Sequence, residues 1–334
     1  MAGLAQYSEF FTNPLFTETI KEIPVKTGYI GSRFLPNEDT YDIDFNETVL
    51  TRQADMADIV DSGAELPLTD RDPVRRVSGE ITDIGQSYIV TKKELAALQD
   101  KGNAGRRRIA ERQLLGKAAL IKGNLDARIE WMKWQALGTG QLAYNKGGIA
   151  LGVDFGVTNI EVAAIKWNGT NPTILLDYEA WVQDYVDLNG FSPDIYVTSI
   201  AAIRVMMNDV ALRKAITGYS DKVLTIAELN TFLVSRQMPK VEAFDSLVTY
   251  RDVDSGGARV TQRLLDAKKG VFLKEGGEIG SLLMGPTVEN GMNPGVYAHT
   301  IDQQRPMRSI IEVVAAAFPK ILEPNYITIT TVLA

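Results

Sequence analysis

Residues 106–137 read RRRIAERQLLGKAALIKGNLDARIEWMKWQAL and contain no proline. Apolar residues recur along this stretch at steps of three and four, which places one apolar stripe along a helix. At 1.5 Å per residue such a helix would be about 48 Å long, whereas a compact chain of this length has a radius of gyration of about 20 Å. We therefore expect a spine helix as long as the body itself, along which the other elements are arranged. Its stripe consists of Leu114, Ala118, Ile121, Leu125, Ile129, Met132 and Ala136.

Glycines mark two features of the spine helix. Gly138 follows the last residue of the stripe and is expected to end the helix as its C′ residue. Gly116 and Gly123 lie inside the helix, where each costs about 1 kcal/mol relative to alanine. A bend or a close approach of another backbone is expected at these two positions.

Upstream of the spine helix, a long hairpin is expected to project from the body. Tyr41, Ile43 and Phe45 alternate with polar residues, as in a half-exposed strand, and strand-like spacing returns from Arg76 to Val90. A solvated loop is one interpretation of the polar segment between them. However, a hairpin with so few apolar residues cannot bury itself and would gain most by lying on another subunit. Its charged residues are Arg52, Asp55, Asp58, Asp61, Glu65, Asp70, Arg71, Asp72, Arg75 and Arg76.

Capping signals and periodicity place the remaining elements. Thr91 with Glu94, and Thr225 with Glu228, match the capping-box spacing and predict two helix starts. A helix over 199–216 is expected to break near Asp209. The other expected elements are a short helix near Phe16–Ile23, a hairpin over 142–151, a helix over 177–190, and strands over 195–197, 241–252, 270–273, 279–284, 308–318 and 326–333.

Composition excludes several kinds of chemistry. The chain has 334 residues, no cysteine and one histidine, so it can form neither a thiolate metal site nor a multi-histidine metal site. His299 is expected to be structural. The net charge of −7 argues against a general nucleic-acid coat. We expect no cofactor, no metal and no membrane contact, and a protein made in a reducing cytoplasm.

One motif leaves an enzymatic alternative open. Gly152–Asn159, within LGVDFGVTNIEV, resembles the phosphate-binding hairpin of the actin, sugar-kinase and Hsp70 ATPases, in which Asp154 would hold Mg²⁺ through water. In those proteins the motif opens the first domain, whereas here it lies in mid-chain without a second glycine-rich phosphate turn. The favoured interpretation is a strand, a turn and a second strand, with Gly and Asn supplying positive φ.

The order of the expected elements is itself informative: an arm, a projecting hairpin, a short helix, a spine helix and a mixed α/β region. This order resembles the major capsid proteins of tailed bacteriophages, specifically the lambda-type family E, which has the Hong Kong 97-like shell fold. The best-matching stretches are the spine start at 106–109, PDIYV at 193–197, residues 264–273 leading into Gly280, and the ending at 308–334.

The resemblance implies an α+β fold divided into named parts. These are an N-arm (1–38), an E-loop hairpin (39–90), a peripheral domain (91–165) that holds the spine helix (106–137), an axial domain (166–300), and C-terminal strands (301–334) that return to the peripheral domain. An encapsulin-like compartment shell protein is the alternative within the same fold.

The resemblance also implies a function and partners. The chain would self-assemble into hexamers and pentamers of an icosahedral phage head that encloses double-stranded DNA, and it would not be an enzyme. Because the arm is short and marked by prolines, a separate scaffolding protein is implied; the other partners would be a portal, a decoration protein and non-specifically bound packaged DNA. The protein would be made in the host bacterial cytoplasm and would end in the virion.

Charged residues in the hairpin and at the start of the spine helix are the candidates for contact between subunits. The three arginines at 106–108 could also touch nucleic acid, but such a run at a helix start is more often a surface or salt-bridge patch. The predicted interface residues are Arg52, Asp70, Arg71, Asp72, Arg75, Arg76, Arg106, Arg107 and Arg108.

Overall fold

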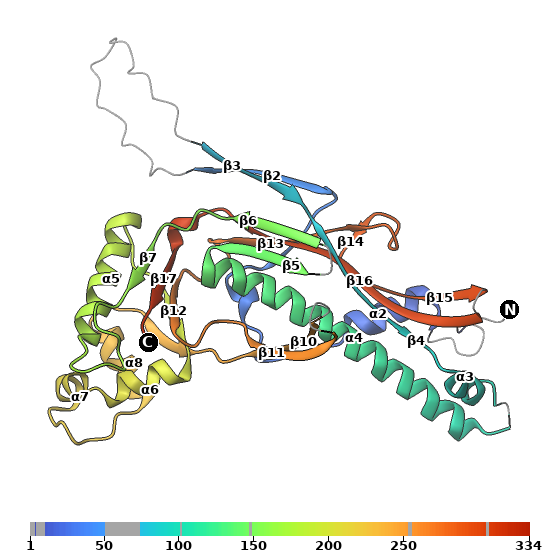
Figure 1. Cartoon of the computed structure of the whole chain (residues 1–334), viewed down its shortest axis with the longest axis horizontal. Coiled ribbons are helices and arrows are strands. Elements are labelled where there is room, and N and C mark those ends of the chain that lie inside the picture. The colour runs from blue at the N-terminus through green and yellow to red at the C-terminus, as the bar shows by residue number, and fades with distance from the viewer. Residues whose placement is uncertain are drawn as a thin grey trace, which may run out of the picture.

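The computed structural model describes Leu4 and residues 11–50, 74–100, 102–146, 149–252, 256–304 and 307–334. A six-stranded sheet lies along the spine helix α4, and a five-stranded sheet with helices α5 to α8 lies at the end where α4 terminates (Figure 1). A two-stranded hairpin, β2–β3, projects from the body (Figure 1).

The predicted spine helix is confirmed as α4 (Ala104–Thr139), which at 1.5 Å per residue is about 54 Å long. Asn103 caps its start, because the Asn103 side chain accepts a hydrogen bond from the Arg106 amide at 3.0 Å. Every residue of the predicted stripe is buried. The prediction that the helix ends at Gly138 is wrong: the helix continues to Thr139, and Gly140 takes the left-handed conformation with φ 69°.

The glycines of α4 differ in what surrounds them. A Cβ added at Gly138 would lie 2.9 Å from Leu265 Cδ1, so this glycine allows close packing. A Cβ at Gly116 or Gly123 would meet nothing within 4 Å. The expected close approach at those two positions is therefore wrong, and the structure shows it at Gly138 instead.

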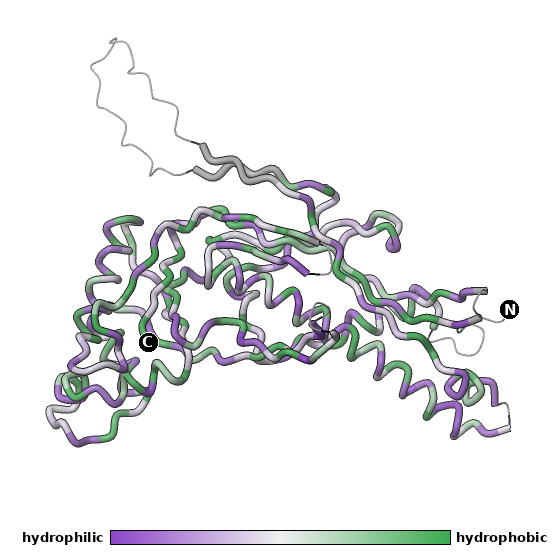
Figure 2. The backbone as a smooth tube through the Cα atoms, viewed as in Figure 1, coloured by the Kyte–Doolittle hydropathy of each residue, from purple (hydrophilic) through white to green (hydrophobic). Residues whose placement is uncertain are grey.

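The six-stranded sheet is organised around one long strand. Residues of β16 pair in antiparallel register with β15, β13 and β4, while β1 adds in parallel to β13. Apolar side chains of this sheet pack against the α4 stripe and helix α2, and Figure 2 shows hydrophilic residues at the free N-terminal end of α4. The strands are β1 (Asn37–Asp39), β4 (Thr82–Ile89), β13 (Gly280–Thr287), β14 (Asn293–Pro294), β15 (Tyr297–Gln304) and β16 (Met307–Ile321).

The five-stranded sheet has the order β7-β17-β12-β8-β9 and an aromatic core. Tyr196 on β8 packs edge-on to Tyr178 at 5.3 Å between ring centroids and lies 4.4 Å from Phe272 on β12. Strand β17 belongs to this sheet and β16 to the other, so the C-terminal strands divide between the two sheets. The strands are β7 (Ile160–Val162), β8 (Ile195–Thr198), β9 (Lys240–Ala243), β12 (Lys269–Leu273) and β17 (Ile327–Thr331).

Both predicted capping boxes are confirmed, at Thr91 with Glu94 and at Thr225 with Glu228. The predicted break at Asp209 is also confirmed, because Asp209 ends one helix and its side chain caps the next by accepting from Leu212 N at 2.8 Å. The helices are α2 (Asn13–Lys21), α3 (Lys92–Leu98), α5 (Ile174–Asn189), α6 (Ile200–Asn208), α7 (Val210–Thr217) and α8 (Ile226–Ser235), with single turns η2 (Gly31–Arg33) and η3 (Pro324–Tyr326).

Three two-stranded hairpins complete the fold, and one predicted strand proves to be divided. The strand expected over 241–252 is two strands, because the Asp245 carboxylate accepts from Ile200 N at 2.7 Å and turns the chain out of the sheet. Strands β11 and β15 were not predicted. The hairpins pair β2 (Asp44–Leu50) with β3 (Val74–Glu80), β5 (Gln141–Lys146) with β6 (Ile149–Asp154), and β10 (Leu247–Asp252) with β11 (Ala258–Arg263).

Candidate assembly interface

The projecting hairpin β2–β3 is held at its root by an aromatic stack. Phe45 is buried and stacks on Phe318 of β16 with ring centroids 4.4 Å apart. Gly79 on the opposite strand leaves room for this ring, since a Cβ there would lie 2.8 Å from Phe45 Cε1. The hairpin therefore leaves the body from a fixed base.

Beyond that base, the hairpin offers surfaces that the monomer does not cover. Among the described residues, no further strand pairs with β2 or β3, so both edges present backbone groups to a partner. In the segment that leads into β2, Tyr41 is 73% exposed and Ile43 is 52% exposed, although both were expected on the face that Phe45 buries. Uncovered apolar side chains beside open strand edges are typical of a protein–protein contact.

The predicted interface residues do not form one cluster. Arg75 and Arg76 lie on β3, opposite Val49 and Thr48 of β2. Arg106 to Arg108 lie at the start of α4, far from the hairpin in Figure 1. The remaining predicted residues lie outside the described part of the chain: Arg52, Asp70, Arg71 and Asp72.

The arginines at the start of α4 have local partners. Arg106 Nη1 lies 3.4 Å from Asp100 Oδ2, and Arg107 Nε lies 4.0 Å from Glu111 Oε1. Exposed ion pairs of this kind contribute about 0–1 kcal/mol each. This geometry fits the salt-bridge patch that was favoured over nucleic-acid contact.

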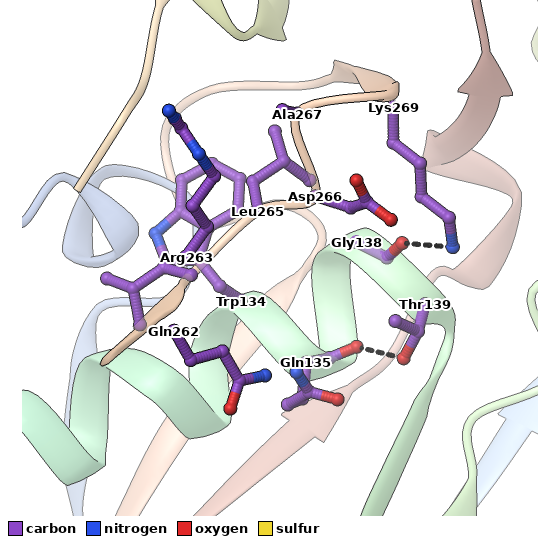
Figure 3. Close-up of a pocket in the computed structure, with 11 residues that line it drawn as sticks. Trp134, Gln135, Gly138, Thr139, Gln262, Arg263, Leu265, Asp266, Ala267 and Lys269 are labelled. Carbon is purple, nitrogen blue, oxygen red and sulfur yellow. Dashed lines mark hydrogen bonds between the residues drawn. The ribbon is translucent and has the colours of Figure 1, made fainter. Parts of the chain in front are cut away.

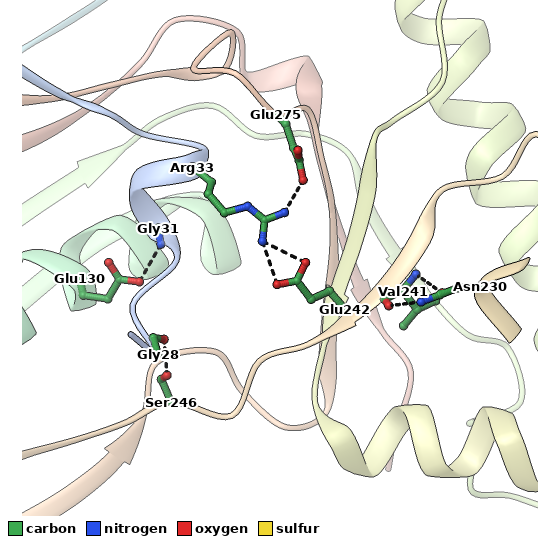
Figure 4. Close-up of polar contacts among 9 residues, drawn as sticks. All are labelled: Gly28, Gly31, Arg33, Glu130, Asn230, Val241, Glu242, Ser246 and Glu275. Atoms are coloured by element: carbon green, nitrogen blue, oxygen red, sulfur yellow. Dashed lines mark hydrogen bonds and ion pairs between the residues drawn. The ribbon is translucent and has the colours of Figure 1, made fainter. Parts of the chain in front are cut away.

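The turn η2 joins three parts of the fold (Figure 4). The Gly31 amide donates to Glu130 Oε1 of α4 at 2.8 Å. Arg33 Nη1 donates to both carboxylate oxygens of Glu242, at 2.8 and 2.9 Å, and Arg33 Nη2 donates to Glu275. The turn thus ties the N-terminal segment to the spine helix, to strand β9 and to the chain that follows β12.

Two ionisable groups beside this turn are buried in α4. Burial raises the pKa of Glu130, against the opposing effect of hydrogen bonds from the Gly31 amide and the Trp134 indole. Burial lowers the pKa of Lys133 to about 8. Lys133 Nζ donates to Ser32 Oγ at 2.8 Å and to Asn37 Oδ1 at 2.9 Å, which places it across the N-terminal segment.

Strand β9 shows how an edge can be closed within one chain (Figure 4). The Asn230 side chain accepts from Val241 N at 2.8 Å and donates to Val241 O at 3.0 Å, so it occupies the place of a neighbouring strand. The contrast with the open edges of β2 and β3 favours the hairpin as the place where another copy binds.

A groove lies between the C-terminal part of α4 and the chain that leads from β11 into β12 (Figure 3). One cavity of about 440 Å³ has Trp134, Leu264 and Leu265 in its lining, with Arg263 and Lys269 among its charged groups. A second cavity of about 210 Å³ shares Gln135 and Gln262 with the first and continues along the hairpin β10–β11.

The residues of the ATPase-like motif are engaged in structural contacts. Strand β6 ends at Asp154, and Asp154 Oδ1 accepts from the Gly156 amide at 2.8 Å. Gly156 has φ 80°, so the predicted turn is confirmed, but Asn159 does not have positive φ. Instead, Asn159 Nδ2 donates to Thr328 Oγ1 at 2.9 Å and joins the turn to β17.

His299 lies on β15, within the six-stranded sheet. It is buried, its ring stacks on Tyr297 at 5.2 Å, and its Nε2 lies 3.5 Å from Glu312 Oε2 on β16. The contact with Tyr297 along β15 and the contact with Glu312 across to β16 fit the structural role expected for it.

The described residues offer neither a membrane-spanning helix nor a cluster of metal ligands. No helix there combines the length and hydrophobicity that crossing a membrane requires. Within the same residues, no group of three or more histidine and acidic side chains is arranged to hold a metal ion.

The contacts of η2 were not predicted from the sequence. Glu130 and Lys133 are charged residues that directly follow Ile129 and Met132 of the apolar stripe, and this placement was the available signal. Their partners lie 99 and 101 residues upstream, so spacing alone could not identify them.

Comparisons with known proteins agree with this geometry. The profile of the family described as phage major capsid protein E matches residues 16–332. A phage-related protein from Bordetella bronchiseptica RB50 is similar in structure, with a TM-score of 0.55, 11% identity and 96% coverage of each chain. A comparison with curated proteins gives no match.

Two further solved structures have the same fold. A prophage protein from Escherichia coli CFT073 has a TM-score of 0.53 and 15% identity over 78% of this chain and 80% of its own. The capsid of Myoviridae phage XM1 has a TM-score of 0.50 and 13% identity over 91% of this chain and 90% of its own. At these identities the likeness concerns the fold.

Proposed function

Because this chain belongs to the family of phage major capsid protein E, we propose that it assembles into hexamers and pentamers that together enclose the packaged DNA. It has the α+β Hong Kong 97-like capsid fold expected from its sequence, and it is a shell-forming protein of the virion.

The projecting hairpin supports assembly through contacts between copies. Its root is fixed by Phe45 on Phe318, while its edges have no strand partner among the described residues. The side chains of Tyr41 and Ile43, in the segment that leads into it, are also uncovered in the single chain. A second copy would bury these surfaces. A hairpin that lies over a neighbour can also follow changes of angle, which a shell built from two kinds of ring requires.

We place the parts of the fold as follows. Residues 1–38 form the N-arm and 39–90 the E-loop, and 91–165 form the peripheral domain around α4. We propose the axial domain within 166–300, with the addition of β17, since β17 pairs with β12. Strands β13 and β14 and the first residues of β15 also fall within these bounds, but they belong with β16 to the six-stranded peripheral sheet.

The predicted interface residues keep their role in this proposal. Arg75 and Arg76, with Arg52, Asp70, Arg71 and Asp72, would make polar and salt-sensitive contacts to the neighbouring copy. Arg106, Arg107 and Arg108 would form a second contact at the outer end of α4.

The proposal also includes partners and a place of synthesis. A separate scaffolding protein, a portal and a decoration protein would act with the shell, and packaged DNA would be contacted without sequence specificity. The net charge of −7 supports weak DNA contact, and the absence of cysteine supports synthesis in the host bacterial cytoplasm. We assign the chain no catalytic role, because Asp154 and Asn159 are engaged in structural hydrogen bonds.

Electron microscopy of the purified chain, expressed alone and with its scaffolding protein, tests the proposal directly. Closed shells of uniform size are expected, with no nucleotide bound in a parallel assay. A chain that stays monomeric at every concentration and salt, with its scaffolding protein present, and that hydrolyses ATP would refute the proposal.

A further inference from the structure

The hairpin β10–β11 has one covered face and one uncovered face. On the covered face, Val248 is buried and the Lys146 ammonium lies 3.8 Å from the centre of the Tyr250 ring. The uncovered face is formed by every second residue of the two strands, and all six of its side chains are exposed. We call it the arginine face; in register it pairs Leu247 with Arg263, Thr249 with Thr261 and Arg251 with Arg259.

Two arginines of this face form no ion pair within the described part of the chain. Arg251 and Arg259 stand directly opposite each other, and like charges in such positions destabilise an antiparallel pair. Arg263, at the other end of the face, is paired with Asp245. The arginine face contains no acid of its own. An anion placed on it would therefore relieve the repulsion between Arg251 and Arg259 as well as attract both.

The composition of the arginine face favours phosphate over a protein partner. Arginine and threonine are among the side chains that contact phosphate oxygens in DNA complexes. Thr249 and Thr261 lie between the arginines, with their Oγ1 atoms 3.0 Å apart. The centre of a protein–protein contact is usually apolar and poor in charged residues, whereas Leu247 is the only apolar residue of this face.

The dimensions of the arginine face suit duplex DNA. Directly opposite residues of an antiparallel pair lie about 5 Å apart, so Arg251 and Arg259 can reach the same phosphate or adjacent ones. Arg259 and Arg263 are four residues apart on β11, which is about 14 Å along the strand. Because phosphates recur about every 3.4 Å of helix axis along each DNA strand, this distance corresponds to about four base pairs. A two-stranded ribbon also fits the major groove, which is about 12 Å wide.

Acids gather on the opposite side of the molecule. In Figure 1 the hairpin β10–β11 lies on the other side of α4 from the hairpin β2–β3. Where β3 leads into β4, burial raises the pKa of Asp83, and the neighbouring carboxylates of Glu289 and Glu80 raise it further. DNA would therefore be repelled by the side that carries β2–β3 and attracted to the arginine face.

We infer that the arginine face binds the phosphate backbone of the enclosed double-stranded DNA, with Arg251 and Arg259 as its main contacts. This inference rests on the proposed shell function and adds to it the surface that meets the DNA. The side of the shell wall that carries β10–β11 then faces the DNA. The contact involves no recognition of bases and is weakened by salt, because the release of counterions from DNA drives it.

Binding of a short, fluorescently labelled DNA duplex to the unassembled chain, measured at several salt concentrations, tests the inference. Each neutralised phosphate contributes about −0.9 to the slope of log affinity against log salt concentration, so Arg251→Gln with Arg259→Gln should make this slope shallower by about 1.8. Arg251→Lys with Arg259→Lys keeps both charges and should keep most of the slope.

Two controls separate this contact from general charge and from misfolding. Lys92→Gln with Lys93→Gln removes equal charge from exposed positions on α3 and should leave the slope unchanged. The unfolding midpoint of the Arg251→Gln, Arg259→Gln variant should be no lower than that of the wild type, since the substitutions remove a repulsion.

A wild-type chain that does not bind the duplex would overturn the inference and leave the shell function standing. The same conclusion follows if the Arg251→Gln, Arg259→Gln variant keeps the wild-type slope; a loss of shell formation in that case would show that the face contacts a protein instead. If the wild-type chain binds DNA through these arginines but forms no shell with its scaffolding protein, the shell function fails and the phosphate contact stands.

Discussion

Glu130 Oε1 accepts a hydrogen bond from the Gly31 amide at 2.8 Å, so a buried carboxylate of the spine helix holds a turn that lies ninety-nine positions earlier in the chain. The same oxygen accepts from the Trp134 indole at 2.9 Å. Through this contact, the position of the N-terminal segment on α4 depends on one side chain.

Replacing Glu130 separates the effect of its charge from that of its hydrogen bonds. Glu130→Ala leaves two buried donors unpaired and should lower the free energy of unfolding by about 2–4 kcal/mol. Glu130→Gln keeps an acceptor and should cost less than about 1.5 kcal/mol, because burial already raises the pKa of Glu130 and disfavours its charged form. Urea denaturation of the unassembled chain measures both, with Glu111→Gln as a control on the same helix; equal losses for Ala and Gln would contradict this account.

Two glycine substitutions should act in opposite directions. A Cβ at Gly31 would lie 2.9 Å from Glu130 Oε2, so Gly31→Ala should destabilise the chain by about 1–3 kcal/mol. Gly123→Ala adds a methyl group in open space within a helix and should stabilise by about 0.5–1 kcal/mol. Thermal unfolding of both variants is the measurement. A loss of stability in Gly123→Ala would mean that this glycine serves an interface in the shell or a bend in α4.

Lys133 should make stability depend on pH. Burial lowers its pKa in the folded chain from 10.5 to about 8. Between these values the unfolded chain binds more protons, so stability rises as pH increases through this window, and the cost of burying the charge is fully present below about pH 8.

Lys133→Met should remove this rise, which amounts to at most about 3 kcal/mol. Urea denaturation at several pH values across the window, for wild type and variant, gives the difference directly. Lys117→Met, on the exposed side of α4, should retain the wild-type slope. An unchanged slope in Lys133→Met would show that Lys133 is not the group responsible.

Charge reversal in the projecting hairpin should separate assembly from folding. Arg75→Glu with Arg76→Glu is expected to reduce particle formation strongly, while circular dichroism and the unfolding midpoint of the unassembled chain stay unchanged. Both residues lie on β3, whose outer edge is free of strand partners among the described residues. Lys92→Glu with Lys93→Glu is the control of equal charge. Normal particles from the hairpin variant would show that these arginines are not at the interface.

The sequence predicted those features that depend on residues close together in the chain, namely the buried face of one helix and the caps at helix ends. The stripe from Leu114 to Ala136 gave the buried face of α4, and Thr91, Asp209 and Thr225 gave helix boundaries through their own side-chain caps. The prediction that α4 ends at Gly138 failed because a glycine can either end a helix or allow close packing. Only the position of Leu265 decides between these two roles.

Features that depend on pairing were not predictable in this way. The opposition of Arg251 and Arg259 follows from the register of β10 with β11, and β11 carries no strong apolar alternation. Similarly, Glu130 and Lys133 are ordinary charged residues of a helix until residues 31–37 are placed over them. The sequence contained the charges, whereas their partners were set by the tertiary fold.

The pairing of β4 with β16 also determines when the protein can fold. Ile89 pairs with Ile310 and Thr82 with Ala317, so the ribosome must synthesise most of the chain after β4 before its partner exists. At about 5–20 residues per second, this delay is on the order of tens of seconds. Throughout that time the nascent chain exposes an unpaired strand and the apolar stripe of α4. The supply of shell subunits therefore depends on translation reaching residue 321, and messages cut short before it would release chains that aggregate.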